Sequence, residues 1–314
     1  MSEGRIIKGV GGNYTIKDNR TKELIVASMR GKFRYMEVDK DSCFNKQLTH
    51  KRKLETKTLK ISPKVGDFVV YLQADGHATI DEIKPRKNDL MRPAIANVDE
   101  VFIIFACANP AMQFNLLDQF LVLMAREGVK TTIIMTKIDL LSATMLIDLK
   151  TKMKYYEDIG YKVYFVNSKT GEGLEDVKPL FTGKISVLSG QTGAGKSTFI
   201  NALIPGYKLR TQEISKALGR GKHTTTAVEL YDYNGGLLAD TPGFSKLDFS
   251  LILDTELKNY FIEFKDECRF RGCLHDKEPG CMVKKHVADG TIAKWRYDNY
   301  LRFLNELRSI NKKY

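Results

Sequence analysis

Residues 190–197 combine glycines, a lysine and a hydroxyl side chain in an order that can hold phosphate groups. The stretch reads Gly190-Gln191-Thr192-Gly193-Ala194-Gly195-Lys196-Ser197 and fits the pattern G-x-x-x-x-G-K-[ST]. Glycines let backbone N–H groups close around phosphate oxygens, Lys196 can reach the β- and γ-phosphates, and Ser197 can ligate Mg²⁺. Residues 185–188 are predicted to form a preceding strand and residues 196–203 a following helix, the setting that such a loop requires. We expect the loop and the adjacent Thr198 to bind a nucleotide, with Lys196 acting in catalysis.

Two stretches further along the chain could complete a magnesium and γ-phosphate site. In Asp240-Thr241-Pro242-Gly243, an Asp at a strand end can hold Mg²⁺ through water, and Gly243 can offer its N–H to the γ-phosphate. Between this stretch and the phosphate loop lie Thr224, Thr225 and Thr226. A Thr hydroxyl can complete the Mg²⁺ shell when GTP is bound and leave it on hydrolysis. All three threonines remain open, and Thr225 is our choice for the magnesium ligand and catalytic-site residue.

A base-reading site is predicted by residues that precede the phosphate loop. In Thr136-Lys137-Ile138-Asp139, the Asp139 carboxylate can accept hydrogen bonds from guanine N1–H and N2–H₂, which adenine cannot supply together. The aliphatic stem of Lys137 can lie on the base. Ser168 and Lys169, in Asn167-Ser168-Lys169-Thr170-Gly171, can support the O6 side. In ordinary GTPases these elements follow the phosphate loop, so the sequence predicts a GTP/GDP site whose motifs run in permuted order. A parallel sheet tolerates such re-cut termini when the old ends lie close together.

The residue that usually orients the attacking water is missing from its expected place. That residue, a Gln, would directly follow the Gly of D-x-x-G, and Phe244 stands there instead. We therefore expect slow intrinsic hydrolysis. His223, just before the threonines, is the candidate catalytic replacement, and contact with phosphate or RNA is the alternative.

Four residues near the C-terminus have the types and spacing of a structural zinc site. Cys268, Cys273, His275 and Cys281 form C-x₄-C-x-H-x₅-C, and three thiolates with one imidazole suit tetrahedral Zn²⁺. His286 is an alternative ligand outside this compact run, and a set of free thiols is the other interpretation. The odd total of five cysteines, three of them clustered, favours metal over disulfides in a reducing compartment.

The elements that must position these residues divide into three predicted domains. Short strand patterns at 5–8, 14–18, 24–29, 69–73 and 77–83 predict an N-terminal β-barrel over residues 1–92, of the oligonucleotide-binding (OB) type or SH3-like. Alternating strands and helices over 93–250 predict a largely parallel α/β sheet covered by helices. Residues 251–314 read as a mainly helical zinc domain, with helices at 254–267 and 291–310.

The charge of the chain points to a polyanionic partner. Lys and Arg number 50 against 38 Asp and Glu, a net charge of +12, which favours nucleic acid. The basic stretch Lys46–Lys64 is either a phosphate-contacting loop or a solvated one. The N-terminus lacks the apolar core of a signal peptide, and the run at 101–108 is too short to cross a bilayer. We therefore expect a cytoplasmic protein with no membrane partner, and nothing argues for an oligomer.

Taken together, the motifs resemble those of the RsgA (YjeQ/YloQ) family of bacterial small-subunit ribosome-biogenesis GTPases. The resemblance rests on the basic barrel, the T-K-I-D, N-S-K-T-G, G-Q-T-G-A-G-K-S, H-T-T-T and D-T-P-G-F motifs, and the Cys₃His module. It implies an OB-type barrel, a circularly permuted GTPase domain and a zinc domain. It also implies binding to the 30S subunit and its 16S rRNA late in maturation, with GTP hydrolysis stimulated by the ribosome. Thr136 stands where the commoner motif has Asn, which bears on the contact between this loop and the phosphate loop.

Three other functions fit parts of the pattern. An ATP-dependent P-loop enzyme such as a kinase would conflict with Asp139, and competition between GTP and ATP would decide. An RNA-binding scaffold with a relic nucleotide site would conflict with Lys196, Ser197 and Asp240, and a phosphate-release assay would decide. A GTPase with another RNA as its partner stays open.

Overall fold

A computed structural model describes most of the chain. The described residues are 1–29, 36–37, 58–59, 62–74, 76–91, 93–206, 228–240, 249, 252–265 and 268–311. No helix within these ranges is both long and apolar enough to cross a membrane.

The N-terminal strands close into a five-stranded barrel, in the order β1-β2-β3-β7-β6. These strands are β1 (Ser2–Val10), β2 (Asn13–Asp18), β3 (Leu24–Met29), β6 (Phe68–Ala74) and β7 (His77–Ile83). All the pairings are antiparallel except that of β3 with β7, which is parallel. The five strand predictions are confirmed, and this Greek-key order selects the OB-type barrel over the SH3-like one.

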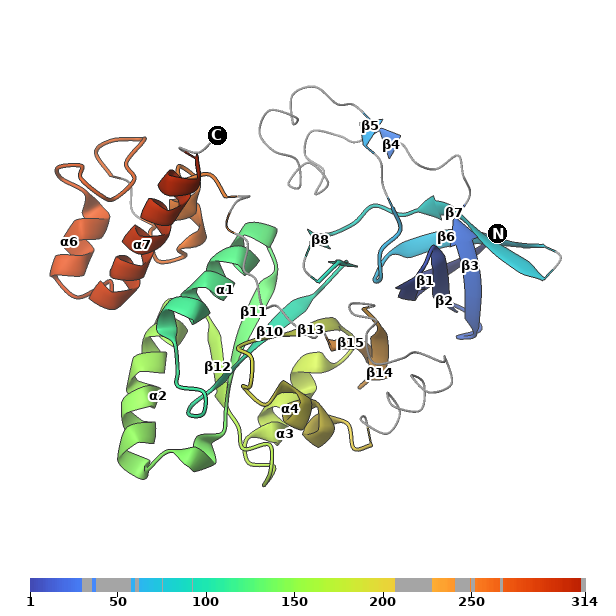
Figure 1. Ribbon diagram of the computed structural model, residues 1–314, viewed down its shortest axis with the longest axis horizontal. Coiled ribbons are helices and arrows are strands. Elements are labelled where there is room, and N and C mark those ends of the chain that lie inside the picture. The colour runs from blue at the N-terminus through green and yellow to red at the C-terminus, as the bar shows by residue number, and fades with distance from the viewer. Residues whose placement is uncertain are drawn as a thin grey trace. The chain divides into compact units, whose positions relative to one another are not determined.

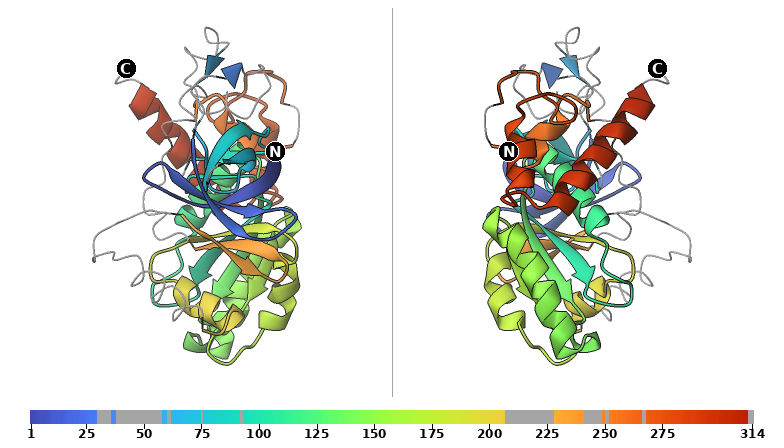
Figure 2. Two further views of the ribbon diagram at one scale, coloured as in Figure 1. Left: turned by 90° about the vertical axis from the view of Figure 1, so that its right-hand side faces the viewer. Right: turned by 90° about the vertical axis from the view of Figure 1, so that its left-hand side faces the viewer.

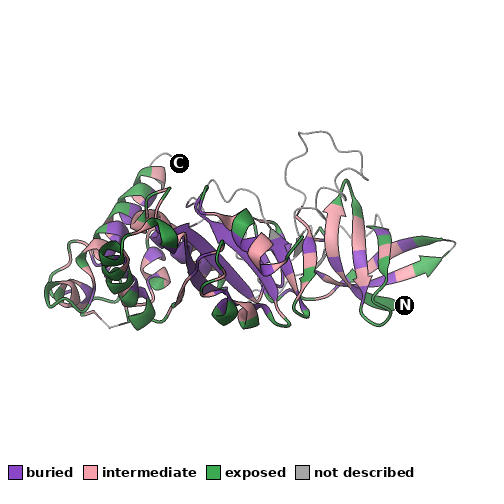
Figure 3. Cartoon of the chain, turned by 90° about the horizontal axis from the view of Figure 1, so that it is seen from below, coloured by how far each residue is buried: buried purple, intermediate pink, exposed green. Residues whose placement is uncertain are grey.

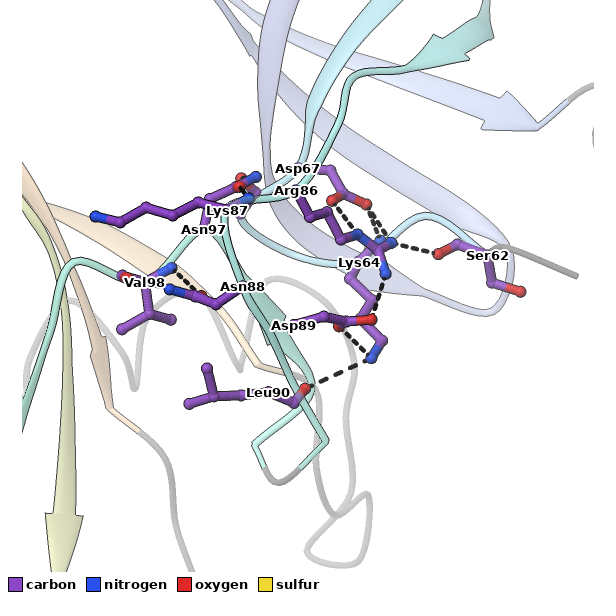
Figure 4. Close-up of polar contacts among 11 residues, drawn as sticks. Ser62, Lys64, Asp67, Arg86, Lys87, Asn88, Asp89, Leu90, Asn97 and Val98 are labelled. Carbon is purple, nitrogen blue, oxygen red and sulfur yellow. Dashed lines mark hydrogen bonds and ion pairs between the residues drawn. The ribbon is translucent and has the colours of Figure 1, made fainter. Parts of the chain in front are cut away.

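Short strands and a buried ion network lie beside the barrel. The strands are β4 (Met36–Glu37), β5 (Thr58–Leu59), β8 (Asp89–Leu90) and β9 (Ile95–Ala96). Arg86 donates from Nε and Nη2 to the two Asp67 oxygens at 2.6 and 2.7 Å, and from Nη1 to Asp89 at 2.8 Å (Figure 4). Lys64 Nζ lies 2.5 Å from the other Asp89 oxygen. Of the basic stretch Lys46–Lys64, all the cations but Lys64 fall outside the described residues, and Lys64 is engaged internally by Asp89.

The central strands form a six-stranded sheet in the order β12-β11-β10-β13-β15-β14 (Figure 1). They are β10 (Glu100–Ala106), β11 (Lys130–Thr136), β12 (Lys162–Phe165), β13 (Ile185–Gly190), β14 (Leu230–Tyr233) and β15 (Gly236–Asp240). The strands β11 and β12 are parallel, as are β13 and β15, whereas β14 is antiparallel to β15. Residues of β10 and β13 are buried along their whole length (Figure 3). This explains the continuous apolar run in β10.

Helices follow the strands as the alternating pattern predicts. They are α1 (Phe114–Glu127), α2 (Ala143–Asp158), α3 (Leu174–Val177) and α4 (Lys196–Leu203), with 3₁₀ turns at Ile138–Leu140 and Lys178–Phe181. The helices α1 and α2 contact β11 and β12 respectively, and Figure 2 shows both on one face of this part of the sheet. Gly128 ends α1 with a left-handed φ of 67°, as expected for a glycine cap.

The C-terminal segment contains a 3₁₀ turn (Leu257–Tyr260), α6 (Met282–Ala288) and α7 (Lys294–Asn311). The helix at 291–310 is confirmed, but the helix expected at 254–267 is wrong. Its described part, residues 254–265, is largely irregular, because Leu257 and Phe261 turn into the core that α1 and α7 share and Phe264 packs against it. Its apolar residues pack into the core and do not line one face of a helix.

By internal contacts the chain divides into two compact units. One comprises Met1–Val101, Leu174–Ser189 and Lys196–Phe244, and the other comprises Phe102–Gly173, Gly190–Gly195 and Ser245–Tyr314. The C-terminal segment therefore belongs with α1 and α2. The predicted division at residues 92 and 250 stays a prediction.

Candidate nucleotide-binding site and Cys₃His cluster

The phosphate loop leaves the end of a buried strand and leads into a helix, as the motif requires. Gly190, the last residue of β13, has a φ of 126°, and a Cβ there would lie 2.1 Å from the Ile104 carbonyl oxygen. Only glycine fits this crossing of two backbones. The loop then runs through Gly193 and Gly195, and α4 begins at Lys196. The sequence prediction of strand, loop and helix is confirmed.

The loop after β11 contacts the phosphate loop directly. Thr136 Oγ1 lies 2.5 Å from the Ala194 carbonyl oxygen and 3.2 Å from that of Phe105. Lys137 Nζ donates to the Gly193 carbonyl oxygen at 2.9 Å. Thr136 thus joins this loop to the phosphate loop even though it replaces the commoner Asn. Its short side chain can do so because the two backbones lie close together.

We expect Thr136→Val to lower GTP affinity about 5- to 30-fold. It removes the hydroxyl that positions the loop, which weakens the free energy of GTP binding by about 1–2 kcal/mol. The change conserves volume, and Thr136→Ser is the matched control because it keeps the hydroxyl. Titration with a fluorescent GTP analogue measures both. Equal affinities of wild type and Thr136→Val would show that the contact does not position the loop.

Asp139 and the loop after β12 also lie together. Lys169 Nζ lies 3.2 Å from Asp139 Oδ2, on a lysine that is 70% exposed. The buried Asn167 holds the turn, since its Oδ1 accepts from the N–H groups of Lys169 and Thr170 at 3.0 and 3.4 Å. Asp139 is partly exposed, as a base-reading carboxylate must be. Ser168 lies within the same turn, as expected from its motif.

The magnesium-side residues are described only in part. Asp240 ends β15, and the parallel register places it opposite Leu188 of β13, two residues before the phosphate loop. It therefore lies at the sheet edge where the phosphate loop begins. His223, Thr224–Thr226 and Gly243 lie outside the described residues, and their roles stay predictions.

The loop after β10 contributes contacts that the motifs did not predict. The carbonyl oxygen of Asn109 accepts from Lys137 Nζ, and that of Ala111 accepts from Gln191 Nε2 at 3.0 Å. Both acceptors are backbone atoms, so residue type carried no signal. The one available signal was position, because ligands bind outside the carboxyl ends of parallel strands.

The Cys₃His cluster (Cys268, Cys273, His275 and Cys281) has the dimensions of a zinc site. The four ligand atoms lie within 4.8 Å of one another. His275 Nδ1 is 3.3–3.5 Å from the three sulfurs, and the sulfurs of Cys268 and Cys281 are 3.8 Å apart. With Zn–S near 2.3 Å and Zn–N near 2.0 Å, a tetrahedron has edges of about 3.5 Å between sulfur and nitrogen and about 3.8 Å between sulfurs. The residues therefore fit Zn²⁺, and the alternative His286 is not part of the group.

Neighbouring side chains hold the cluster's backbone. Tyr297 donates to the His275 carbonyl oxygen at 2.6 Å, and Lys258 donates to that of Cys273 at 2.9 Å. The Glu278 carboxylate accepts from two backbone N–H groups between the ligands, both at 2.9 Å. These partners orient the ligand residues in advance of any metal.

The order of these elements along the chain defines a class of protein. A phosphate loop contacted by the loop that bears T-K-I-D, which precedes it in sequence, at the edge of a mostly parallel sheet, is the arrangement of a circularly permuted P-loop GTPase. The family model described as RsgA GTPase matches residues 83–250. The chain belongs to the RsgA GTPase family, whose members hydrolyse GTP.

Relatives and solved structures match nearly the whole chain. The chain is 42% identical to a small ribosomal subunit biogenesis GTPase RsgA of Phytoplasma mali (strain AT), over 99% of this chain and 98% of that protein. It is 41% identical to the RsgA of Bacillus subtilis (strain 168), over the full length of both. Crystal structures of YloQ, titled a circularly permuted GTPase, and of YjeQ from Thermotoga maritima match with TM-scores of 0.77 and 0.79 at 36% and 32% identity. Each match covers 98% of this chain, and 96% and 98% of the other.

Proposed function

We propose that the chain binds GTP and Mg²⁺ at this site and hydrolyses GTP to GDP and phosphate on the 30S ribosomal subunit, late in its maturation. The observation that carries the proposal is the contact of Thr136 and Lys137 with the phosphate loop. It holds the loop that bears Asp139 against the phosphate loop. A nucleotide held at this loop by its phosphates would then present its base to the Asp139 carboxylate.

The proposed role of each residue in the site follows from the chemistry of its side chain or backbone. Asp139 selects guanine, Lys137 covers the base, and Ile138, Ser168 and Lys169 complete its pocket. Residues 190–198 surround the phosphates, and Lys196 neutralises charge on the γ-phosphate as the bond to it breaks. Ser197, Thr225 and Asp240 would hold Mg²⁺, which supplies further charge neutralisation, and Gly243 would donate to the γ-phosphate. The nucleotide is thereby positioned for attack by water.

His223 is the proposed water-orienting residue, because Phe244 cannot serve. We expect His223→Ala to lower kcat about 10- to 100-fold while GTP affinity changes little. The exposed barrel residue His77, changed to Ala, is the control for the loss of a histidine elsewhere. If 30S-stimulated kcat is the same in His223→Ala and wild type, His223 is not catalytic.

Several features support the ribosome as partner. The relatives are named small ribosomal subunit biogenesis GTPases, and the net charge of +12 suits a partner whose surface is mostly phosphate. The OB-type barrel is a fold that binds oligonucleotides. We therefore propose 16S rRNA as the direct contact, a monomer as the acting form, and the cytoplasm as its location. The three domains at 1–92, 93–250 and 251–314 and a Zn²⁺ ion in the Cys₃His cluster complete the proposal.

The test is phosphate release from GTP with and without purified 30S subunits. We expect slow release alone, faster release with 30S subunits, and no competition by excess ATP. An ATP-dependent enzyme would instead lose GTP turnover when ATP is added, and a scaffold would release no phosphate in either case. Turnover that 30S subunits leave unchanged would contradict the proposed partner.

A further inference from the structure

The loop between the first two cysteines of the Cys₃His cluster presents an aromatic ring to solvent. This knuckle loop comprises Arg269-Phe270-Arg271-Gly272, and all four residues are exposed. Phe270 is 44% exposed. Among the described residues after 145, Ile147 is the only other large apolar side chain that is exposed. The Arg269 guanidinium lies 5.7 Å from the centroid of the Phe270 ring, within cation–π range.

The knuckle loop is held by its surroundings. Its two ends are the cluster residues Cys268 and Cys273, and Cys273 N–H donates to the Phe270 carbonyl oxygen at 3.0 Å. Lys258 Nζ donates to the carbonyl oxygens of Arg271 and Cys273 at 3.3 and 2.9 Å. A ring on a backbone fixed in this way loses little further freedom on binding.

The charge around the ring favours an anionic ligand. Glu278 accepts from backbone N–H groups, and the Asp276 carboxylate pairs with Arg308 at 2.7 Å. No acidic side chain within the described ranges pairs with the guanidinium of Arg269 or Arg271; Asp266 and Glu267 lie outside those ranges. The two arginines therefore flank the ring as a pair of cations facing solvent.

We propose that the knuckle loop binds an unpaired nucleotide of RNA, with Phe270 stacking on the base and Arg269 and Arg271 contacting the flanking phosphates. This deepens the proposed function, on which it rests, by naming the kind of RNA that the C-terminal segment recognises. An aromatic face takes any base without sequence preference, whereas a duplex keeps its bases stacked and out of reach. The combination of one ring and two cations thus selects single-stranded RNA over a helix.

The test compares Phe270→Leu with wild type for binding a fluorescent single-stranded oligoribonucleotide and a duplex of the same sequence. Leucine keeps an apolar side chain but removes the aromatic face. We expect single-strand affinity to fall about 5- to 150-fold, the range that loss of one base–aromatic stack spans, with duplex affinity unchanged. Phe270→Trp should restore single-strand binding. Quenching of 2-aminopurine in the single strand should accompany binding by wild type and be lost in Phe270→Leu.

Two controls separate recognition from folding. Zinc content and thermal unfolding of Phe270→Leu should equal those of wild type, and Ile147→Ala, which truncates an exposed apolar residue of α2, should bind both RNAs normally. The double variant Arg269→Gln/Arg271→Gln should weaken binding to both RNAs and lower its salt dependence.

Three outcomes would overturn the proposal. These are unchanged single-strand affinity in Phe270→Leu, an equal loss for single strand and duplex, and weakened 30S binding with normal single-strand binding. The last would mean that the ring contacts protein. Because oligonucleotide binding is measured without GTP or ribosomes, its result is independent of whether 30S subunits stimulate turnover.

Discussion

Removal of the Zn²⁺ proposed for the Cys₃His cluster is expected to unfold residues 268–292 while the six-stranded sheet stays folded. Cys273 and Cys281 pack with Val283 and Ile292 in a small core of their own, too small to be stable without a further constraint. Structural Zn²⁺ sites contribute about 10–16 kcal/mol to folding, the largest single contribution expected in this chain. Cys273→Ser should therefore lose both zinc and local order.

Hydrogen exchange with and without a chelator measures this effect. Backbone amides in 268–292 should lose protection, whereas those of β10 and β13 should keep it. Cys107→Ala is the matched control. It removes a buried cysteine that directly follows β10 and is not part of the cluster. Burial and the nearby Asp139 raise the pKa of the Cys107 thiol to about 12, so without a metal this thiol stays protonated near neutral pH. Undiminished protection in a metal-free protein would contradict the structural role of the metal.

Arg296→Met is expected to lower the free energy of unfolding by about 3–5 kcal/mol, because it leaves two buried carboxylates without their cation. Arg296 on α7 is fully buried. Its Nη1 lies 2.5 Å from Asp118 on α1, and its Nε lies 2.6 Å from Glu263. Asp118 also accepts from Tyr156 and Asn299, both at 2.7 Å. Burial alone would lower the pKa of Arg296, but Asp118 and Glu263 hold it well above its ordinary value, so the guanidinium stays charged.

Urea unfolding followed by the fluorescence of Trp295, the chain's single tryptophan, measures this loss. Trp295 neighbours Arg296 and packs on Phe114 with ring centroids 5.2 Å apart, so it reports the contact of α7 with α1. Lys294→Ala is the control on the same helix: Lys294 pairs with Asp298 but is 77% exposed, and its loss should cost under about 0.5 kcal/mol. Equal effects of the two substitutions would contradict the importance of the buried network.

The buried ion pairs of Arg296 constrain how a change of bound nucleotide could move the C-terminal segment. Val122 of α1 shares one buried core with Phe261 and Phe303 of that segment, and Asp118 of α1 pairs with Arg296 of α7 at 2.5 Å. Movement of the segment would therefore have to carry α1 with it or break a fully buried ion pair.

The strands and the phosphate loop were predictable from sequence because their signals are local. The short strand patterns and the continuous apolar run of β10 each depend on neighbouring residues. The permuted order was also evident from the sequence, because the motifs that contain Asp139 and Lys196 can be identified without knowledge of the tertiary structure. The barrel type was left open because it depends on strand pairing, which the parallel contact of β3 with β7 decides.

Contacts between distant residues were not predictable. Asp118 and Arg296 are 178 positions apart, and a lone Asp in a helix is usually exposed. The stretch at 254–267 has enough apolar residues for a helix, but their tertiary contacts override that tendency. For Thr136, the sequence indicated a departure from the commoner Asn, and only the 2.5 Å approach to Ala194 shows what replaces it.

The most direct test of a permuted guanine site is the nucleotide preference of Asp139→Asn. The wild type should bind GTP far better than ATP, because only guanine offers two donors to the carboxylate. In Asp139→Asn, affinity for GTP should fall about 100-fold, while xanthosine triphosphate gains, since its C2 carbonyl can accept from the new amide. If Asp139→Asn keeps the GTP preference of the wild type, Asp139 does not read the base, and the loops that precede residue 190 do not form the site.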